Sequence, residues 1–203
     1  MIIAVVNNKG GIGKTSTATF LTQLALREKG KTVVAVDVCG QQNFSDNLES
    51  DGSSGFDVEV IHSADRTPDE SALRKFDYAI IDTPPTTQTS VMRKIIEFSD
   101  AIVIPFLLQK HAIYGLDEVL GIVPEDKEVF LVCIMPKKLP EYEAQLLSLV
   151  DKNFGRDYFR VPLLARINKN FALKRPFDYG LKKDEKDAFL KVFKTIKKEV
   201  NAK

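Results

Sequence analysis

The chain has 203 residues, a net charge of +1 and a hydrophobic content of 44%, which exclude a disordered or fibrous protein and favour one globular domain over residues 1–203. The two cysteines, Cys39 and Cys133, show no spacing typical of a zinc site or a disulfide framework, so we expect free thiols in a reducing compartment. The longest apolar run, residues 101–108, is shorter than the ~20 residues of a membrane-spanning helix. The apolar N-terminus lacks the basic leader of a signal peptide. We therefore expect a cytoplasmic protein.

Charge is distributed unevenly along the chain. Residues 1–130 contain 12 Lys and Arg against 19 Asp and Glu, a net of −7, whereas residues 131–203 contain 17 against 9, a net of +8. The split indicates an acidic partner for the C-terminal third, although an ordinary solvated surface would have the same composition.

Short β-rich runs alternate with helical patterns along the chain. Strands are predicted at residues 2–7, 32–37, 56–62, 78–82, 101–106 and 129–135. Helices are predicted at residues 15–29, 90–98, 112–122, 141–152 and 185–200. Several strands are apolar at every position, which is typical of parallel strands covered on both faces. The alternation predicts an α/β fold, a doubly wound and mostly parallel sheet flanked by helices on both faces.

A glycine-rich loop joins the first predicted strand to the first predicted helix. Its residues are Lys9, Gly10, Gly11, Ile12, Gly13, Lys14 and Thr15, followed by Ser16. Glycines let backbone N–H groups converge on an anion, and the helix N-terminus adds the positive end of its dipole. The loop therefore predicts phosphate binding, with Lys14 on the β- and γ-phosphates and the Thr15 hydroxyl on Mg²⁺. The strict pattern G-x-x-x-x-G-K-[ST] fails only because Asn8 occupies its first glycine.

The pattern that does fit, K-G-G-x-G-K-[ST], resembles the deviant Walker A box of the ParA/MinD superfamily of ATPases. The resemblance implies a P-loop NTPase domain, ATP and Mg²⁺ as cofactors, and a homodimer that sandwiches two nucleotides. In that dimer Lys9 would reach the ATP bound to the partner chain and act in trans, as an arginine finger does. The alternative for Lys9 is a surface lysine in a glycine turn.

A second acidic segment, residues 76–85, reads FDYAIIDTPP. It places Asp82 at the end of a buried strand, at the edge of the sheet where such folds bind ligands. The segment looks like the superfamily's Walker B strand, which implies that Asp82 holds Mg²⁺ through water. The stiff loop Thr83-Pro84-Pro85 would respond to the γ-phosphate.

The segment after the second strand resembles the family pattern D-x-D-P-Q-[GS]-N, but it departs from that pattern at one important position. Asp37, Gln41 and Asn43 match, which implies that Asp37 serves in metal binding and catalysis, whereas Cys39 replaces the aspartate that orients the attacking water. A neutral thiol accepts hydrogen bonds poorly, so we expect slow or partner-stimulated hydrolysis, since loss of such a group costs ~10²–10⁴-fold in rate. Alternatively, the loop is shifted and Cys39 only packs.

The C-terminal third lacks the asparagine with which relatives read adenine, near Ile134 or Met135. Base contacts are therefore expected from the loop over residues 171–179, at Pro176 and Phe177.

Basic residues with interleaved aromatics in the same C-terminal third predict a non-specific DNA-binding surface. Its candidates are Lys137, Lys138, Arg156, Arg160, Arg166, Lys169, Lys174, Arg175, Lys182 and Lys183.

Together these features predict a short ParA-type partition ATPase. It would dimerise on ATP, bind DNA non-specifically on the nucleoid, position plasmid or chromosomal DNA, and respond to a ParB-like centromere-binding or cargo adaptor protein. One alternative is a MinD-like membrane-associated protein that uses the basic amphipathic helix at residues 185–200, although packing of that helix on the sheet is the favoured interpretation. Another is a hydrolysis-deficient ATP-dependent switch.

Overall fold

The computed structural model describes residues 1–40, 43–48, 58–63, 66–86, 89–154, 158–162, 167, 169–170, 173 and 175–203. Its centre is a seven-stranded sheet in the order β3-β2-β4-β1-β5-β6-β7, with every neighbouring pair parallel. The strands are β1 (Ile2–Val5), β2 (Val33–Asp37), β3 (Glu59–His62), β4 (Tyr78–Asp82), β5 (Ala101–Leu107), β6 (Glu128–Met135) and β7 (Tyr158–Pro162). The predicted doubly wound α/β fold is confirmed.

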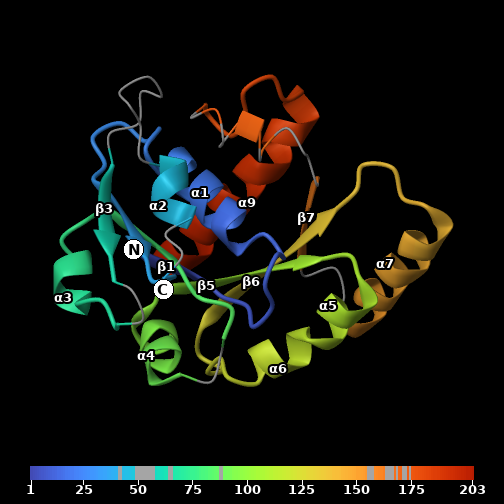
Figure 1. Ribbon diagram of the computed structural model, residues 1–203, viewed down its shortest axis with the longest axis horizontal. Coiled ribbons are helices and arrows are strands. Elements are labelled where there is room, and N and C mark those ends of the chain that lie inside the picture. The colour runs from blue at the N-terminus through green and yellow to red at the C-terminus, as the bar shows by residue number, and fades with distance from the viewer. Residues whose placement is uncertain are drawn as a thin grey trace.

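Helices cover both faces of the sheet (Figure 1). They are α1 (Lys14–Ala25), α2 (Asn43–Leu48), α3 (Glu70–Leu73), α4 (Ser90–Phe98), α5 (Lys110–Tyr114), α6 (Leu116–Leu120), α7 (Glu141–Phe154) and α9 (Lys183–Asn201). Alternate strand residues serve two separate cores: Ile3 packs with α1 and α9, whereas Ile2 packs with α4, α5, α6 and α7. Both residues are fully buried, as strands covered on both faces require.

Several predicted boundaries were wrong for local reasons. The first helix ends at Ala25, four residues before the predicted end, and its chain then turns at Gly30 with φ of 73°. The helix predicted at 112–122 is two short helices that meet at Gly115. β7 was not predicted, because Arg160 and Pro162 interrupt its apolar pattern.

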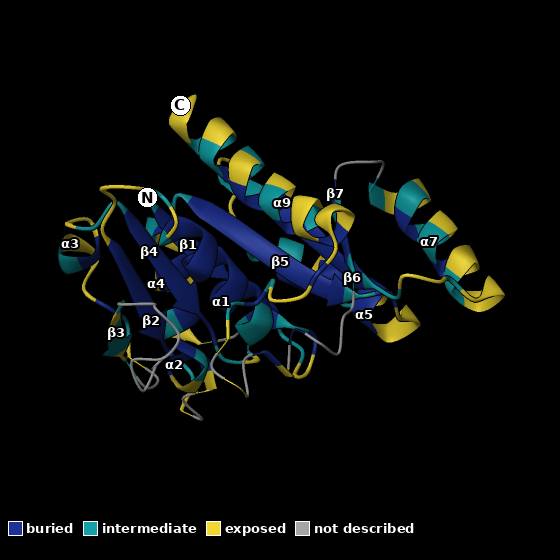
Figure 2. Ribbon diagram, turned by 90° about the horizontal axis from the view of Figure 1, so that it is seen from above, coloured by how far each residue is buried: buried dark blue, intermediate teal, exposed yellow. Residues whose placement is uncertain are grey.

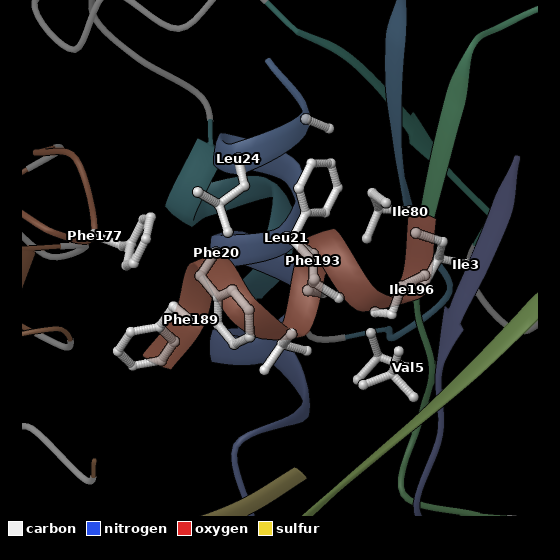
Figure 3. Packing of buried hydrophobic residues seen from close by; sticks show 14 of the residues in the cluster. Ile3, Val5, Phe20, Leu21, Leu24, Ile80, Phe177, Phe189, Phe193 and Ile196 are labelled. Carbon is white, nitrogen blue, oxygen red and sulfur yellow. The ribbon is translucent and has the colours of Figure 1, made fainter. Parts of the chain in front are cut away.

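The last helix, α9, packs its apolar face on the sheet. Phe189, Phe193 and Ile196 are each at most 2% exposed, and Figure 3 shows them among side chains of α1 and the strands. The Phe20 and Phe189 rings lie 4.9 Å apart in an edge-to-face arrangement, a favoured geometry for aromatic pairs. Figure 2 shows the opposite side of α9 exposed, so the packing interpretation is confirmed.

Among the described helices, none combines the length and apolar character needed to cross a membrane.

Candidate nucleotide-binding site

A cavity of about 390 Å³ lies at the carboxyl edge of the sheet, next to the glycine loop. β1 pairs with β4 on one side and β5 on the other, so the order in which strands are added to the sheet reverses at β1. Parallel sheets bind ligands at such a switch point. The cavity is lined by Gly10, Gly11, Gly13, Lys14, Thr15, Ser16, Thr17, Phe20, Cys39, Asn43, Thr83, Pro85, Leu107, Ile134, Val161, Pro162, Ile167 and Phe189.

Two glycines give the loop its curvature. Gly11 and Gly13 have φ of 70° and 94°, a region that other residues enter only with strain. Gly13 is further constrained because a Cβ there would stand 2.5 Å from the Ile134 Cδ1 atom. The loop that precedes α1 therefore needs glycine at both positions. Ile12 is buried and is not among the residues lining the cavity.

The Lys14 side chain brings a positive charge to the cavity at a solvation cost. It is 7% exposed, and its Nζ donates a hydrogen bond of 2.6 Å to the Lys9 carbonyl. Burial lowers the pKa of Lys14, while the nearby Asp82 and Cys39 oppose that shift. An ammonium deprived of water at the start of α1 is suited to an anionic ligand.

Thr15 and Asp82 form the polar floor of the site. The Thr15 hydroxyl donates to Asp82 Oδ2 at 2.7 Å, while Asp82 Oδ1 is buried and has no hydrogen-bond partner in the described part of the chain. Burial raises the pKa of Asp82 to about 7, with Thr15 opposing the shift. An orphaned carboxylate oxygen beside a hydroxyl fits Mg²⁺, which takes few protein ligands and completes its shell with water and phosphate oxygens.

Asp37 has a different environment from the one predicted. Its Oδ1 accepts from the Cys39 amide, and its Oδ2 accepts from the Phe44 amide and from the amide and hydroxyl of Ser45. Both oxygens are therefore engaged in holding the loop after β2 and the start of α2. These bonds give Asp37 a positioning role, while Oδ1, which accepts a single hydrogen bond from the described residues, keeps acceptor capacity for the predicted catalytic and metal-binding roles.

Cys39 lies half-buried at the cavity wall, and Asn43 lines the same cavity. The geometry therefore brings Cys39 to the nucleotide cavity rather than into the core. Gln41 lies outside the described residues. Cys133, by contrast, is buried in β6, and burial raises the pKa of its thiol to about 12.

Lys9 belongs to the loop but is not among the described residues that line the cavity. Its aliphatic stem lies beside Gly115, at the junction of α5 and α6, where a Cβ would stand 3.2 Å from Lys9 Cε. Its amide donates to the Asn7 side chain at 3.0 Å. The loop thus presents one lysine to its own cavity and directs the other along its outer side.

Comparisons with known proteins agree with this geometry. The family model described as AAA domain matches residues 1–73. The sporulation initiation inhibitor protein Soj of Bacillus subtilis is 26% identical over 212 residues, which cover 84% of this chain and 79% of Soj. The maintenance of carboxysome distribution protein A of Gloeobacter kilaueensis is 29% identical over 51% of this chain and 48% of that protein. These matches support a relationship of the chain to the P-loop ATPases of the ParA/MinD superfamily.

Solved structures show the same fold at low identity. Apo McdA of Cyanothece superposes with a TM-score of 0.76 at 17% identity, covering 96% of this chain and 98% of McdA. A plasmid partition protein of Borrelia burgdorferi bound to AMPPNP gives a TM-score of 0.72 at 19% identity, covering 96% of this chain and 98% of its own. Members of the ParA/MinD superfamily are ATPases, and an ATP complex of McdA is among the similar structures.

The cavity wall includes two aromatic residues that the sequence analysis did not assign to the site. Phe20 and Phe189 line it, whereas Phe177 is 1% exposed and packs within the core. The Phe177 amide donates to Gln23 at 2.7 Å and its carbonyl accepts from Asn170 at 2.9 Å. These bonds occupy the backbone groups that were predicted to read the base, and Pro176, like Phe177, is not among the described residues of the cavity wall. Phe20 and Phe189 were missed because each lies on the apolar stripe of a predicted helix, and such a stripe predicts packing in the core.

The residues that were predicted to contact DNA differ in their surroundings. Lys137 pairs with Asp184 and Glu185, Arg160 pairs with Asp151, and Arg175 lies over the Tyr179 ring. Lys138, Lys169, Lys182 and Lys183 are exposed. Arg156, Arg166 and Lys174 lie outside the described residues.

Proposed function

We propose that the chain is a ParA-type positioning ATPase. It binds ATP with Mg²⁺ in the cavity and forms a nucleotide-sandwich homodimer. The dimer binds DNA without sequence specificity and segregates plasmid or chromosomal DNA in the cytoplasm. The observation that carries this proposal is the different placement of two lysines in one loop, because Lys14 lines the cavity while the stem of Lys9 lies beside Gly115 and is not among the described residues of the cavity wall.

The described residues suggest how nucleotide would be held. Amides of the glycine loop and the Lys14 ammonium would bind the phosphates, and Thr15 with Asp82 would hold Mg²⁺, which screens phosphate charge when bound. Thr83 donates to the Val5 carbonyl at 2.7 Å, so the loop after β4 is fixed to β1 beside the cavity. A change at the γ-phosphate would reach the dimer surface through Thr83 and Pro85.

A dimer would also double the basic surface of the C-terminal third. Non-specific DNA binding depends on the number of phosphates contacted, and two linked surfaces bind far more tightly than one. Nucleotide-dependent dimerisation would thereby control DNA affinity, and a ParB-like centromere-binding or cargo adaptor would trigger release. The plasmid partition protein of Borrelia burgdorferi, which has the same fold, supports the choice of a partition role.

A second candidate function is an ATP-dependent switch with very slow hydrolysis. It is favoured by Cys39, whose thiol lines the cavity where the superfamily pattern has a water-orienting aspartate. The dimer would then be long-lived and would depend on its partner for release.

The test is fluorescence polarisation of a random-sequence DNA duplex at fixed salt, with ATP–Mg²⁺, ADP–Mg²⁺ or no nucleotide. We expect tight binding with ATP–Mg²⁺ only. Absence of binding in all three states would overturn the DNA-binding proposal and leave a MinD-like membrane role to be tested with liposomes.

A further inference from the structure

The segment before the glycine loop is attached to the α5–α6 pair on the outer surface of the molecule. The Asn8 side chain donates from Nδ2 to Glu118 Oε2 at 2.6 Å. The next residue, Lys9, lays its stem beside Gly115, one turn earlier on the same helix pair. The two contacts therefore fix adjacent residues of the loop to adjacent positions of one surface element.

The inner side of this segment is fixed as well. Asn7 donates from its side chain to the Pro105 carbonyl at 3.0 Å and accepts from the Lys9 amide. The Lys9 carbonyl accepts from Lys14 Nζ. These hydrogen bonds hold the backbone of Lys9. The direction of its side chain therefore depends on the surface against which its stem lies, which is Gly115.

Glycine at position 115 leaves room for the Lys9 stem and does not serve a special backbone conformation. Its φ of −78° and ψ of −10° are ordinary helical values that any residue adopts. A side chain there would meet Lys9 Cε at 3.2 Å, which is closer than an ordinary van der Waals contact. The absence of a side chain at Gly115 thus leaves a surface on which the lysine stem lies.

We propose that Glu118 and Gly115 are positioning residues for Lys9, and that α5–α6 holds this lysine outward for its contact with the partner chain. A lysine stem that is already ordered loses less conformational freedom when the dimer forms. This inference rests on the proposed function, because it assigns a purpose to an outward-facing Lys9. It also explains Asn8, which replaces the first glycine of the strict phosphate-loop pattern and uses its side chain to reach Glu118.

Dimerisation of the full-length chain tests the inference. Sedimentation velocity with ATP–Mg²⁺ would be measured for wild type, Lys9→Ala, Glu118→Ala, Glu118→Gln and Gly115→Leu, and ADP affinity would be measured with a fluorescent ADP analogue. We expect Glu118→Ala and Gly115→Leu to weaken the ATP-dependent dimer by roughly two- to fivefold, the effect of one exposed charged contact. ADP affinity should stay unchanged, because neither residue lines the cavity. Glu118→Gln keeps an oxygen acceptor for Asn8 and should restore wild-type dimerisation.

The matched control is Asp117→Ala, which removes the neighbouring exposed carboxylate of α6 and should leave dimerisation unchanged. Wild-type dimerisation by Glu118→Ala, or an equal loss in Asp117→Ala, would overturn the inference while leaving the proposed function intact. An equal loss of ADP affinity in Glu118→Ala would also overturn it, because the contact would then serve the folding of the loop. A Lys9→Ala chain that dimerises normally would overturn the trans role itself.

A second measurement does not depend on dimerisation. Acylation of Lys9 by a water-soluble succinimidyl ester, followed by mass spectrometry, reports how freely its amine moves without nucleotide. We expect faster Lys9 labelling in Glu118→Ala and Gly115→Leu than in wild type and Asp117→Ala. Equal labelling rates in all four proteins would contradict the positioning contact.

Discussion

Asp37 and Cys39 are two residues apart, yet they face different surroundings. The Asp37 carboxylate is 1% exposed and accepts four hydrogen bonds that hold the loop after β2. Cys39 lines the cavity, with its amide donating to Asp37. Asp37 therefore holds the loop in shape, whereas Cys39 lies where a ligand in the cavity would contact it.

Replacing Cys39 by aspartate should therefore increase hydrolysis. A carboxylate at the cavity wall accepts a hydrogen bond from water that a thiol does not accept well, so we expect ATP turnover to rise by ~10²-fold or more. The rate of phosphate release at saturating ATP measures this turnover. Cys39→Asn is the control, because asparagine matches aspartate in size but lacks its charge. Equal rates for wild type and Cys39→Asp would refute the assignment of Cys39.

Asp178 ties the segment after β7 to α1 and gives the fold a pH dependence. Arg27 donates to both of its oxygens, at 2.7 and 3.0 Å, and Lys186 lies 3.8 Å away. Burial alone would raise the pKa of Asp178, but these cations outweigh burial and lower it. A lowered folded-state pKa stabilises the fold above the unfolded value of 3.8, and that contribution disappears as pH falls through this range.

Asp178→Asn should lower the unfolding free energy at pH 7 by about 0.5–1 kcal/mol, a small value because Arg27 is 40% exposed. The difference from wild type should shrink as pH is lowered from 7 towards 3.5. Thermal unfolding of the nucleotide-free protein across this pH range measures the difference in stability between wild type and Asp178→Asn. Asp187→Asn, on the exposed surface of α9, is the control. A difference that grows at low pH would contradict the assigned sign.

At the scale of elements, α9 acts as a core helix rather than as an attached anchor. Phe193 is 2% exposed and its ring lies 5.7 Å from that of Tyr78. The Tyr78 hydroxyl in turn donates to Glu28 at 2.7 Å, and Glu28 pairs with Lys197 of α9. The helix therefore joins β4 and the end of α1 to one apolar core.

Phe193→Ala should cost about 3–5 kcal/mol of unfolding free energy, the usual cost of removing a fully buried phenylalanine. Lys194→Ala, on the exposed side of the same helix, should change stability by less than about 0.5 kcal/mol. Urea unfolding compares the two. Equal stability of both variants would mean that the apolar face of α9 is not part of the core.

For the whole molecule, residues 131–203 have a net charge of +8, but their cations are not equally available to a partner, because several of them form ion pairs. Lys137 bridges to Asp184 and Glu185 at the start of α9, which raises the pKa of Lys137 chiefly through its hydrogen bond to Glu185. Lys138 and Lys169 are exposed. A DNA surface in this region should therefore depend unequally on its lysines.

Lys138→Ala and Lys169→Ala should each weaken ATP-dependent DNA binding and reduce the slope of log affinity against log salt by about 1, as loss of one phosphate contact does. Lys137→Ala should have a smaller effect. Polarisation titrations at several salt concentrations measure the slopes. Identical slopes for all three variants and wild type would argue against a DNA contact at these lysines.

The sequence was informative wherever a function depends on neighbouring residues. The glycine loop, Lys14, Thr15 and Asp82 were predicted because their motifs are local, and the structure brings them together. The positions of Phe20 and Phe189 at the cavity could not be predicted, since they depend on how α9 crosses α1. The Asn8–Glu118 contact spans 110 residues and left no local pattern.

The position of Phe189 at the cavity wall also has a consequence for biosynthesis. The glycine loop is translated before α9, and the wall that α9 provides is added only after the strands of the described sheet. A nascent chain would therefore display the loop before it had a complete site. A ligand in this cavity would then stabilise chains in which α9 has packed over those in which it has not.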